Sequence, residues 1–173
     1  RFLGESKVAP LPSVGHLADI AAPAILLSQA IGRLGDIING EHFASATSLP
    51  WGIIYSHPNS PAFGLPASHP AVAYELLMDL ALLAVLWPLR KRIRPQGMFF
   101  ALYLATYSVG RFFVSFLREE FNDYGGLNEA QIIALVVMGI TIPLLAFKAR
   151  LAKPGDEPPK SGTRSSRRRA RRA

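Results

Sequence analysis

Two groups of polar residues recur at helical spacing inside apolar stretches of this sequence. The first group is Gln29, Arg33, Asp36 and Gly40, with Asn39 and Glu41 beside them. Spacings of four, three and four residues place the first four on one face of a helix. A charged residue inside a membrane span costs at least about 2.5 kcal/mol, so it is usually paired or functional. Two interpretations stay open: an Arg33–Asp36 pair that only lets the helix insert, or a site for a polar headgroup.

The second group is Tyr107, Arg111, Ser115 and Arg118, which again share one helical face. The guanidinium group of arginine is a planar fork that can bind two phosphate oxygens at once. Arg111 lies seven residues before the expected helix end, which favours a phosphate ligand there. Arg118 lies at that end and is expected to reach water beside Glu119.

A third group consists of His69, Tyr74, Glu75 and Asp79 at the start of the next apolar segment. Glu75 and Asp79 are four residues apart and repel each other, so they need cationic partners or a proton. Arg33 and Arg111 are the candidates for these partners. His69 is interpreted either as a residue at a helix start or as a general base.

The sequence lacks the residues that several kinds of functional site require. The chain has no cysteine, which excludes disulfides, cysteine-ligated metals and a cysteine nucleophile. Three histidines, His42, His57 and His69, are scattered over one loop without metal-ligand spacing. The sequence contains no glycine-rich nucleotide loop and no serine-nucleophile motif. We therefore expect neither a metal ion nor a cofactor.

Four apolar segments must position these groups. They are residues 17–39, 71–89, 97–117 and 132–147, the last extended by Ala130 and Gln131. Each approaches the ~20 residues that cross a bilayer, so the sequence predicts an all-α integral membrane protein with four transmembrane helices. Gly32, Gly35 and Gly40 are predicted to let a neighbouring helix approach the first segment closely.

Basic residues set the expected orientation of these segments. The basic cluster at 90–94 and the chain from Lys148 onward fall on the same side of the membrane. The positive-inside rule makes this side the cytoplasm. The loop 42–70 is then outside, and Arg33 and Arg111 both fall toward the outer face.

The chain divides into a connector at 1–16, a membrane domain at 17–150 and a disordered basic cytoplasmic tail at 151–173. The tail accounts for the net charge of +7, because 11 basic and 10 acidic residues remain without the eight basic and two acidic ones from Lys153 onward. Directly after an apolar helix, such a tail favours contact with lipid and a role in topology over nucleic acid binding. Since the chain starts at Arg1 without Met or a signal peptide, we expect an N-terminal part to precede it.

These residues resemble the motifs of one known family, bacterial prolipoprotein diacylglyceryl transferase. The family signature GR-x-GN-x-x-N-x-E-x-x-G resembles residues 32–44, GRLGDIINGEHFA. Further similar segments are 47–52 (TSLPWG), 69–75 (HPAVAYE), 107–112 (YSVGRF), 118–119 (RE) and 125–143. The resemblance runs in order from about Asp19 to Phe147.

The resemblance implies a multi-pass enzyme of the bacterial inner membrane with about seven helices, four of them in this chain, and with residues 17–150 as its catalytic domain. Such an enzyme transfers the diacylglyceryl group of phosphatidylglycerol to the lipobox cysteine thiol of a preprolipoprotein, and glycerol phosphate leaves. This reaction is the first step of bacterial lipoprotein maturation. The implied partners are phosphatidylglycerol, the lipobox peptide and membrane lipid.

The resemblance also implies roles for individual residues. Arg33 and Arg111 would bind the phosphate and stabilise the leaving glycerol phosphate, and Tyr107 would orient it. The other residues implied in catalysis or substrate binding are Asp36, Asn39, Glu41, His69, Tyr74 and Glu75. The base for the thiol proton is either His69 or a histidine upstream of Arg1.

The chain departs from the family pattern at four positions. The family's Asn is Asp36, its last signature Gly is Ala44, a frequent Gln is Val72, and a Glu after the second arginine is Ser115. The alternative function is therefore a non-catalytic homologue that binds anionic phospholipid or scaffolds a membrane partner. A small transporter is a further alternative, which the order of the motifs disfavours.

Overall fold

Four long helices make up most of the chain. The computed structural model describes residues 12–40, 44–118 and 123–152. The helices are α1 (Val14–Asn39), α2 (Ala71–Leu86), α3 (Met98–Val114) and α4 (Glu129–Lys148), and two 3-10 turns, η1 (Trp87–Lys91) and η2 (Ser115–Leu117), extend α2 and α3. With these extensions, all four are long and apolar enough to cross a membrane. The predicted all-α membrane fold is confirmed.

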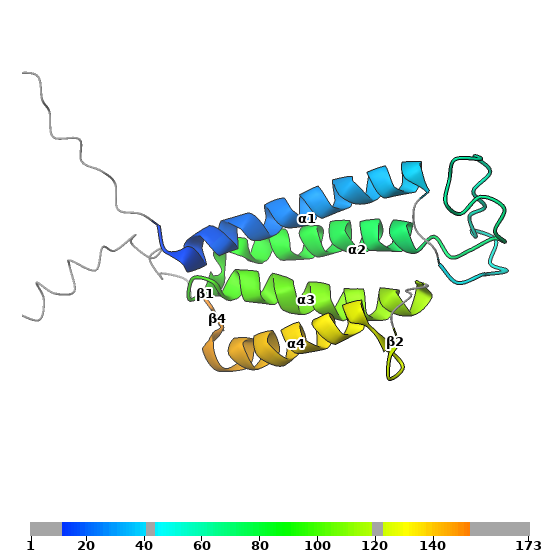
Figure 1. The fold of residues 1–173 in the computed structure, drawn as a ribbon. Coiled ribbons are helices and arrows are strands. Elements are labelled where there is room, and N and C mark those ends of the chain that lie inside the picture. Colours follow the sequence, from blue (N-terminus) through cyan, green and yellow to red (C-terminus); the bar gives the residue numbers. More distant parts are fainter. Residues whose placement is uncertain (1–11, 41–43, 119–122, 153–173) are drawn as a thin grey trace, which may run out of the picture.

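The helices lie side by side and alternate in direction (Figure 1). α1 packs along α2, α3 packs along α4, and α3 also contacts both α1 and α2. The first and last described residues, 12 and 152, lie at the end of the bundle where α1 begins, which we call the terminal end. The segment 44–70 lies at the opposite end, which we call the loop end.

Side-chain caps determine where α1 and α4 begin. The Ser13 hydroxyl accepts a hydrogen bond from the His16 N–H at 3.2 Å, so α1 starts at Val14, earlier than predicted. At the start of α4, the Asn128 and Gln131 side chains form a reciprocal capping box. These polar caps satisfy backbone groups that a helix leaves open at its first turn.

Gly40 ends α1 and fixes the segment that follows. It adopts the left-handed conformation, with φ of 66°, and its N–H donates to the Asp36 carbonyl at 2.9 Å. A Cβ atom at Gly40 would lie 2.7 Å from both Ser60 Oγ and Tyr55 Cδ1. The Ser60 hydroxyl also donates to the Gly40 carbonyl at 3.0 Å. The segment 44–70 is therefore packed directly against the end of α1.

A carboxylate of α1 caps α3 at the terminal end. Asp19 Oδ2 accepts a hydrogen bond from the Gly97 N–H at 2.8 Å, and Oδ1 accepts one from the Phe100 N–H at 2.9 Å. An acidic group at a helix N-terminus satisfies open N–H groups and the helix dipole. Ser13 Oγ adds a hydrogen bond to Gln96 Oε1 at 2.5 Å. α1 and α3 are thereby joined by polar contacts as well as by packing.

The close helix approach occurs at a glycine other than those predicted. A Cβ atom at Gly110 would lie 2.1 Å from Met78 Sδ, so α3 approaches α2 closely at this point. A Cβ atom at Gly32 or Gly35 would meet no described atom within 4 Å, and both glycines are exposed. The prediction for these two glycines is wrong. Successive residues are turned by about 100° around a helix, so Gly32 and Gly35 lie on another side of α1 than Arg33, which faces the neighbouring helices.

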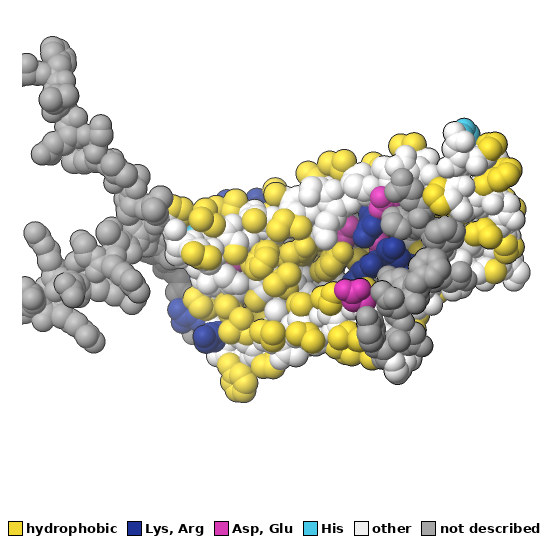
Figure 2. Space-filling view, in the orientation of Figure 1, with side chains coloured by type: hydrophobic (Ala, Val, Ile, Leu, Met, Phe, Trp, Pro, Cys, Tyr) yellow, Lys and Arg dark blue, Asp and Glu magenta, His cyan; other side chains and the backbone are white. Residues whose placement is uncertain are grey.

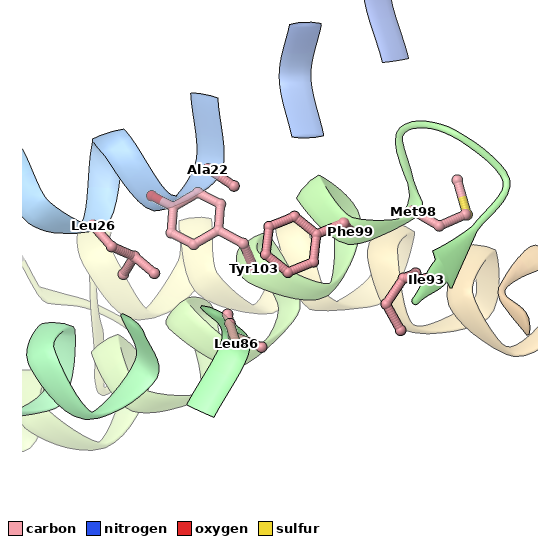
Figure 3. Close-up of a cluster of buried hydrophobic side chains, with 7 residues drawn as sticks. All are labelled: Ala22, Leu26, Leu86, Ile93, Met98, Phe99 and Tyr103. Atoms are coloured by element: carbon pink, nitrogen blue, oxygen red, sulfur yellow. The ribbon is translucent and has the colours of Figure 1, made fainter. Parts of the chain in front are cut away.

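Buried apolar side chains fill the bundle toward the terminal end (Figure 3). The cluster consists of Ala22, Leu26, Leu86, Ile93, Met98, Phe99 and Tyr103. Other large apolar side chains face outward, including Ile38, which is 84% exposed, and Phe147, which is 88% exposed. Helices that are apolar all round are typical of membrane spans, where lipid surrounds the outer faces.

Short strand pairs close both ends of the bundle. β1 (Ile93–Arg94) pairs antiparallel with β4 (Arg150–Leu151) at the terminal end. β2 (Asp123–Tyr124) pairs antiparallel with β3 (Leu127–Asn128) at the loop end. The bridges that hold the segment 44–70 are Ala44–Arg118, Ala46–Ser68 and Ile53–Ser68. Leu151, the first residue of the predicted disordered tail, belongs instead to β4, and the predicted tail from 153 onward lies outside the described residues.

Candidate functional site

Three arginines converge on one buried carboxylate, that of Glu75. Arg33 Nη2 lies 2.5 Å from Glu75 Oε2, and Arg118 Nη1 donates to Glu75 Oε1 at 3.0 Å. Arg111 Nη1 donates to the same Oε1 atom. Only 1% of the Glu75 side chain is exposed, whereas the arginine side chains are 20%, 18% and 14% exposed. We call this group the arginine cluster; its carboxylate is buried and its cations stay partly accessible.

Three helices bring the arginine cluster together. Arg33 lies near the end of α1, Glu75 in the first turns of α2 and Arg111 in the last turn of α3. Because these helices alternate in direction, all three positions fall at the loop end (Figure 1). Figure 2 shows basic side chains in a hollow at this end, with acidic side chains beside them. The prediction that Arg33 and Arg111 converge and pair with Glu75 is confirmed.

Arg118 belongs to the cluster, contrary to the sequence-based expectation. It follows η2, and its backbone forms an isolated bridge with Ala44 from the segment after α1. Its side chain turns back to Glu75 instead of reaching water, so the predicted interfacial role is wrong. The spacing of seven residues from Arg111, two helical turns, is the sequence signal for this placement.

Two further carboxylates accompany Glu75. Asp36 accepts a hydrogen bond from Arg33 Nη1 at 2.8 Å, so the i,i+3 pair of the first interpretation is formed. Asp79 lies one turn deeper in α2 and is 1% exposed. Its Oδ1 accepts no hydrogen bond from any described residue. At this site, the described residues therefore include three arginines (Arg33, Arg111 and Arg118) and three carboxylates (Asp36, Glu75 and Asp79).

An apolar groove adjoins the cluster between α3 and α4. It has a volume of 340 Å³, and its lining includes Tyr107 and Arg111 from α3 and Ala130, Ile133 and Ala134 from α4. Tyr107 and Arg111 line the groove together on the α3 side. The loop end of the groove therefore carries a guanidinium group, and the rest is mainly apolar.

A second pocket, of 540 Å³, lies between the end of α1 and the segment 44–70. Asn39 lines it together with Tyr55, His57 and Ser60. Burial raises the pKa of the Tyr55 hydroxyl above its ordinary value. Asn39, predicted for the site, belongs to this outer pocket, and Glu41, also predicted, lies outside the described residues.

His69 and Tyr74 lie on the loop side of the cluster. The Tyr74 hydroxyl accepts a hydrogen bond from Trp51 Nε1 at 2.8 Å. The His69 ring lies 6.3 Å from the Tyr74 ring, and its Nδ1 is buried without a hydrogen bond to a described residue. Tyr74 therefore contacts the segment 44–70, to which His69 belongs, and among the described residues neither side chain bonds to an arginine.

Gln29 and Ser115 link helices beside the cluster. Tyr103 donates a hydrogen bond to Gln29 Oε1 at 3.1 Å, which joins α3 to α1. Ser115 is 1% exposed, and its carbonyl accepts a hydrogen bond from Asn128 Nδ2 at 3.2 Å. Because the sequence places Ser115 on the face of Arg111 without indicating burial, this link between the end of α3 and the start of α4 could not be foreseen.

The arginine cluster presents guanidinium donors of the kind that bind oxyanions. A guanidinium group carries five N–H donors in a fixed planar arrangement, and the contacts of Arg33 to Asp36 and Glu75 are made through Nη1 and Nη2. The buried Glu75 carboxylate orients the guanidinium groups before any ligand arrives. Donors held in this way bind an oxyanion without a large cost of reorganisation.

Comparison with known proteins gives the family. The family model described as prolipoprotein diacylglyceryl transferase matches residues 8–147. The chain is 34% identical over 146 residues to the phosphatidylglycerol–prolipoprotein diacylglyceryl transferase of Dehalococcoides mccartyi, which covers 84% of this chain and 56% of that protein.

Two other relatives with the same name are similar. The one from Cutibacterium acnes is 40% identical over 146 residues, covering 82% of this chain and 49% of that protein. The one from Nocardia farcinica is 39% identical over 158 residues, covering 83% of this chain and 30% of that protein. The chain spans about half the length of the curated relatives that it matches, or less. The family match includes α1 to α3 and nearly all of α4, and on this basis the chain belongs to the prolipoprotein diacylglyceryl transferase family.

Proposed function

We propose that this chain forms the phosphate-binding part of an enzyme that transfers the diacylglyceryl group of phosphatidylglycerol to the lipobox cysteine of a preprolipoprotein. The observation that supports this most is the arginine cluster on buried Glu75, in a chain of this family. Phosphatidylglycerol combines one phosphodiester anion with two acyl chains. An arginine cluster beside an apolar groove offers a partner for each part.

The proposed reaction exchanges an oxygen for a sulfur on one glyceryl carbon. The thiol of the lipobox cysteine loses its proton to a base, and its sulfur forms a bond to the glyceryl carbon that carries the phosphate. The bond between this carbon and the phosphate oxygen breaks, and glycerol phosphate leaves with the electron pair. The phosphate gains negative charge along this path, so cationic donors around it stabilise the transition state more than the bound substrate.

Arg33 and Arg111 are the proposed catalytic residues because their partly exposed guanidinium groups come from different helices and meet at one point. Tyr107 is proposed to orient the phosphate from the α3 side. Glu75 is proposed as a positioning residue. It is buried below the arginines, and a carboxylate in contact with the phosphate would repel it.

The groove between α3 and α4 is proposed to hold part of an acyl chain. Its volume of 340 Å³ lies at the small end of the range for ligand pockets. Small side chains, Ala130 and Ala134, leave the space open on the α4 side. A chain in this groove would run along α3 from the phosphate at Arg111 toward the membrane interior.

The proposed function also requires a particular membrane and a particular orientation of the helices in it. The relatives are bacterial, and we propose the inner membrane, with the loop end outside and the terminal end, including the C-terminus, in the cytoplasm. The basic residues of β1 and β4 lie at the terminal end, which agrees with the positive-inside rule. The lipobox peptide would then reach the arginine cluster from the outer face.

Complementation of a transferase-depleted strain tests this function. The full-length protein that contains this chain is expressed, and growth and lipidation of a reporter preprolipoprotein are measured. Arg33→Ala should abolish lipidation while the protein still inserts, because the phosphate loses a charged fork. Arg33→Lys keeps the charge but loses the fork, and it should retain only a small part of the activity. Arg92→Ala, which removes the same charge at the terminal end, serves as the control.

Three outcomes would change the proposal. Full lipidation by Arg33→Ala would remove this residue from the phosphate site. Full lipidation by Arg33→Lys would reduce its role to that of a point charge. Insertion of the wild-type protein without any transfer would favour a homologue that binds anionic lipid without catalysis.

A further inference from the structure

Six basic side chains gather at the terminal end, far from the arginine cluster. They are Arg90, Lys91, Arg92, Arg94, Lys148 and Arg150. Figure 2 shows Lys and Arg side chains at this end of the molecule, at the lower left. The carboxylate described at this end, Asp19, accepts backbone N–H groups of α3. Within residues 12–40, 44–118 and 123–152, these six side chains form no ion pair.

The fold holds two of the six close together. The register of β1 and β4 places Arg94 directly opposite Arg150. Directly opposite residues of an antiparallel pair project from the same face with Cβ atoms about 5 Å apart, and like charges there are destabilising. The pairing persists because Ile93 is buried in the core and the Ala152 N–H donates to the Arg92 carbonyl at 2.6 Å. One anion between the two guanidinium groups would remove their repulsion.

The surroundings of this pair are amphipathic. Three large apolar side chains at this end are exposed, with Trp87 at 50%, Phe147 at 88% and Leu151 at 64%. Arg90 stacks on the Trp87 ring, with its Cζ 3.9 Å from the ring centroid, and donates to the Trp87 carbonyl at 2.6 Å. Tryptophan beside basic residues at helix ends is typical of the membrane interface. A ligand here must therefore present an anion next to hydrocarbon.

We propose that Arg94 and Arg150 together bind the phosphate of an anionic phospholipid at the terminal end, in the leaflet opposite the arginine cluster. The bidentate geometry of arginine suits a phosphate shared by two side chains. The bound lipid neutralises the like-charged pair and stabilises the β1–β4 ladder, which ties the turn between α2 and α3 to the end of α4. This site is separate from the transfer reaction and does not depend on it.

Tryptophan fluorescence can report on this site alone. The chain has two tryptophans, and Trp51 lies in the segment 44–70 at the loop end. A Trp51→Phe background leaves Trp87 as the only reporter in this chain, and any tryptophan in the rest of the full-length protein is replaced by Phe as well. The protein is placed in phosphatidylcholine vesicles with a small fraction of brominated phosphatidylglycerol or brominated phosphatidylcholine. We expect brominated phosphatidylglycerol to quench Trp87 more strongly at equal fraction.

Substitutions of the pair test the assignment of the phosphate. Arg94→Gln and Arg150→Gln should each weaken the preference for phosphatidylglycerol by about tenfold, the value that corresponds to ~1.5 kcal/mol for a hydrogen bond to a charged group. Lys91→Gln and Arg92→Gln remove the same charge from the same end and should change the preference little. If the control variants lose as much of the preference as Arg94→Gln and Arg150→Gln do, the basic residues attract anions in general and the proposed site is overturned.

Charge reversal keeps the proposal testable if neutral variants unfold. Arg94→Glu creates an ion pair with Arg150 across the ladder, so it should raise the melting temperature in detergent while removing the preference for phosphatidylglycerol. Retention of the preference in Arg94→Glu would contradict the proposal. Loss of the preference in the wild type on addition of inorganic phosphate would identify a site for soluble anions and overturn the assignment to lipid.

Discussion

Arg118 Nη1 lies 3.0 Å from Glu75 Oε1, although Arg118 is beyond the last residue of α3 and Glu75 is in the first turns of α2. The same oxygen accepts a hydrogen bond from Arg111. One buried carboxylate therefore joins the ends of three helical elements, and its partners cannot be changed independently. The arginine cluster should respond to substitution as a single unit.

The first prediction concerns this coupling. Glu75→Gln should destabilise the protein by on the order of 3 kcal/mol, because three guanidinium groups lose their buried anion. Arg118→Gln should cost less, since Arg33 and Arg111 still pair with Glu75. The loss of stability in the double variant should differ from the sum of the two single losses by about 0.5–3 kcal/mol. Thermal unfolding in detergent measures all three variants, and strict additivity would contradict a shared network.

The second prediction concerns the contact of α2 with α3. Gly110→Ala should destabilise the bundle by about 1–3 kcal/mol, because the new Cβ would meet Met78 Sδ at 2.1 Å. Methionine is flexible, so part of the clash can be relieved by a change of rotamer. Met78→Ala in the same chain should restore much of the loss. If Gly110→Ala alone has no effect on the melting temperature, the helices are not in close contact here.

The third prediction separates backbone strain from crowding at the end of α1. Gly40→Ala combines a positive φ of 66° with contacts of 2.7 Å to Tyr55 and Ser60. Gly64→Ala has a positive φ of 80° but no atom within 4 Å, so it shows the strain alone, about 1–3 kcal/mol. Gly40→Ala should therefore lower the melting temperature more than Gly64→Ala does. Equal effects of the two substitutions would show that Tyr55 and Ser60 move away from the new Cβ atom without a loss of stability.

The fourth prediction tests the acyl groove of the proposed function. Ala134 is 3% exposed and lines the groove on the α4 side. Ala134→Phe should fill much of the groove and raise KM for long-chain phosphatidylglycerol more than for a short-chain analogue. Ala146→Phe is a control with the same change in bulk, because Ala146 is exposed on α4 and does not line the groove. A uniform loss of kcat for both lipids would indicate a folding defect instead.

The sequence was sufficient to predict the four helices and the contact of Arg33 and Arg111 with Glu75. Apolar segments of membrane length have few structural solutions, because the bilayer requires every backbone group to bond within the segment. Alternation of direction then brings the end of one helix, the start of the next and the end of the third to one face. The predicted pair of Glu75 with the two arginines follows from these facts alone.

Other features depend on contacts that the sequence does not encode locally. Arg118 shares the helical face of Arg111 by its spacing. It follows the end of a helix, however, so the spacing does not decide whether its side chain turns inward to Glu75 or toward water. Gly32, Gly35 and Gly110 look equivalent in the sequence, because helices that are apolar on every side give little indication of which side meets a neighbour. The cap of α1 at Ser13 is a local signal, and the connector predicted at 1–16 overlooked it.

Asp19 has a mechanical consequence for the arginines far from it. Its bonds to the first turn of α3 fix α1 to α3 at a point about 21 Å along α1 from Arg33. A widening between the two helices that keeps these bonds is a rotation about this pivot, with the largest displacement at the loop end, and it breaks the Tyr103–Gln29 hydrogen bond on the way. A tilt of about 10° would move Arg33 by roughly 4 Å relative to Arg111. The Asp19 bonds therefore keep relative movement of α1 and α3 small near Ala22, close to the pivot, and concentrate it near the arginine cluster.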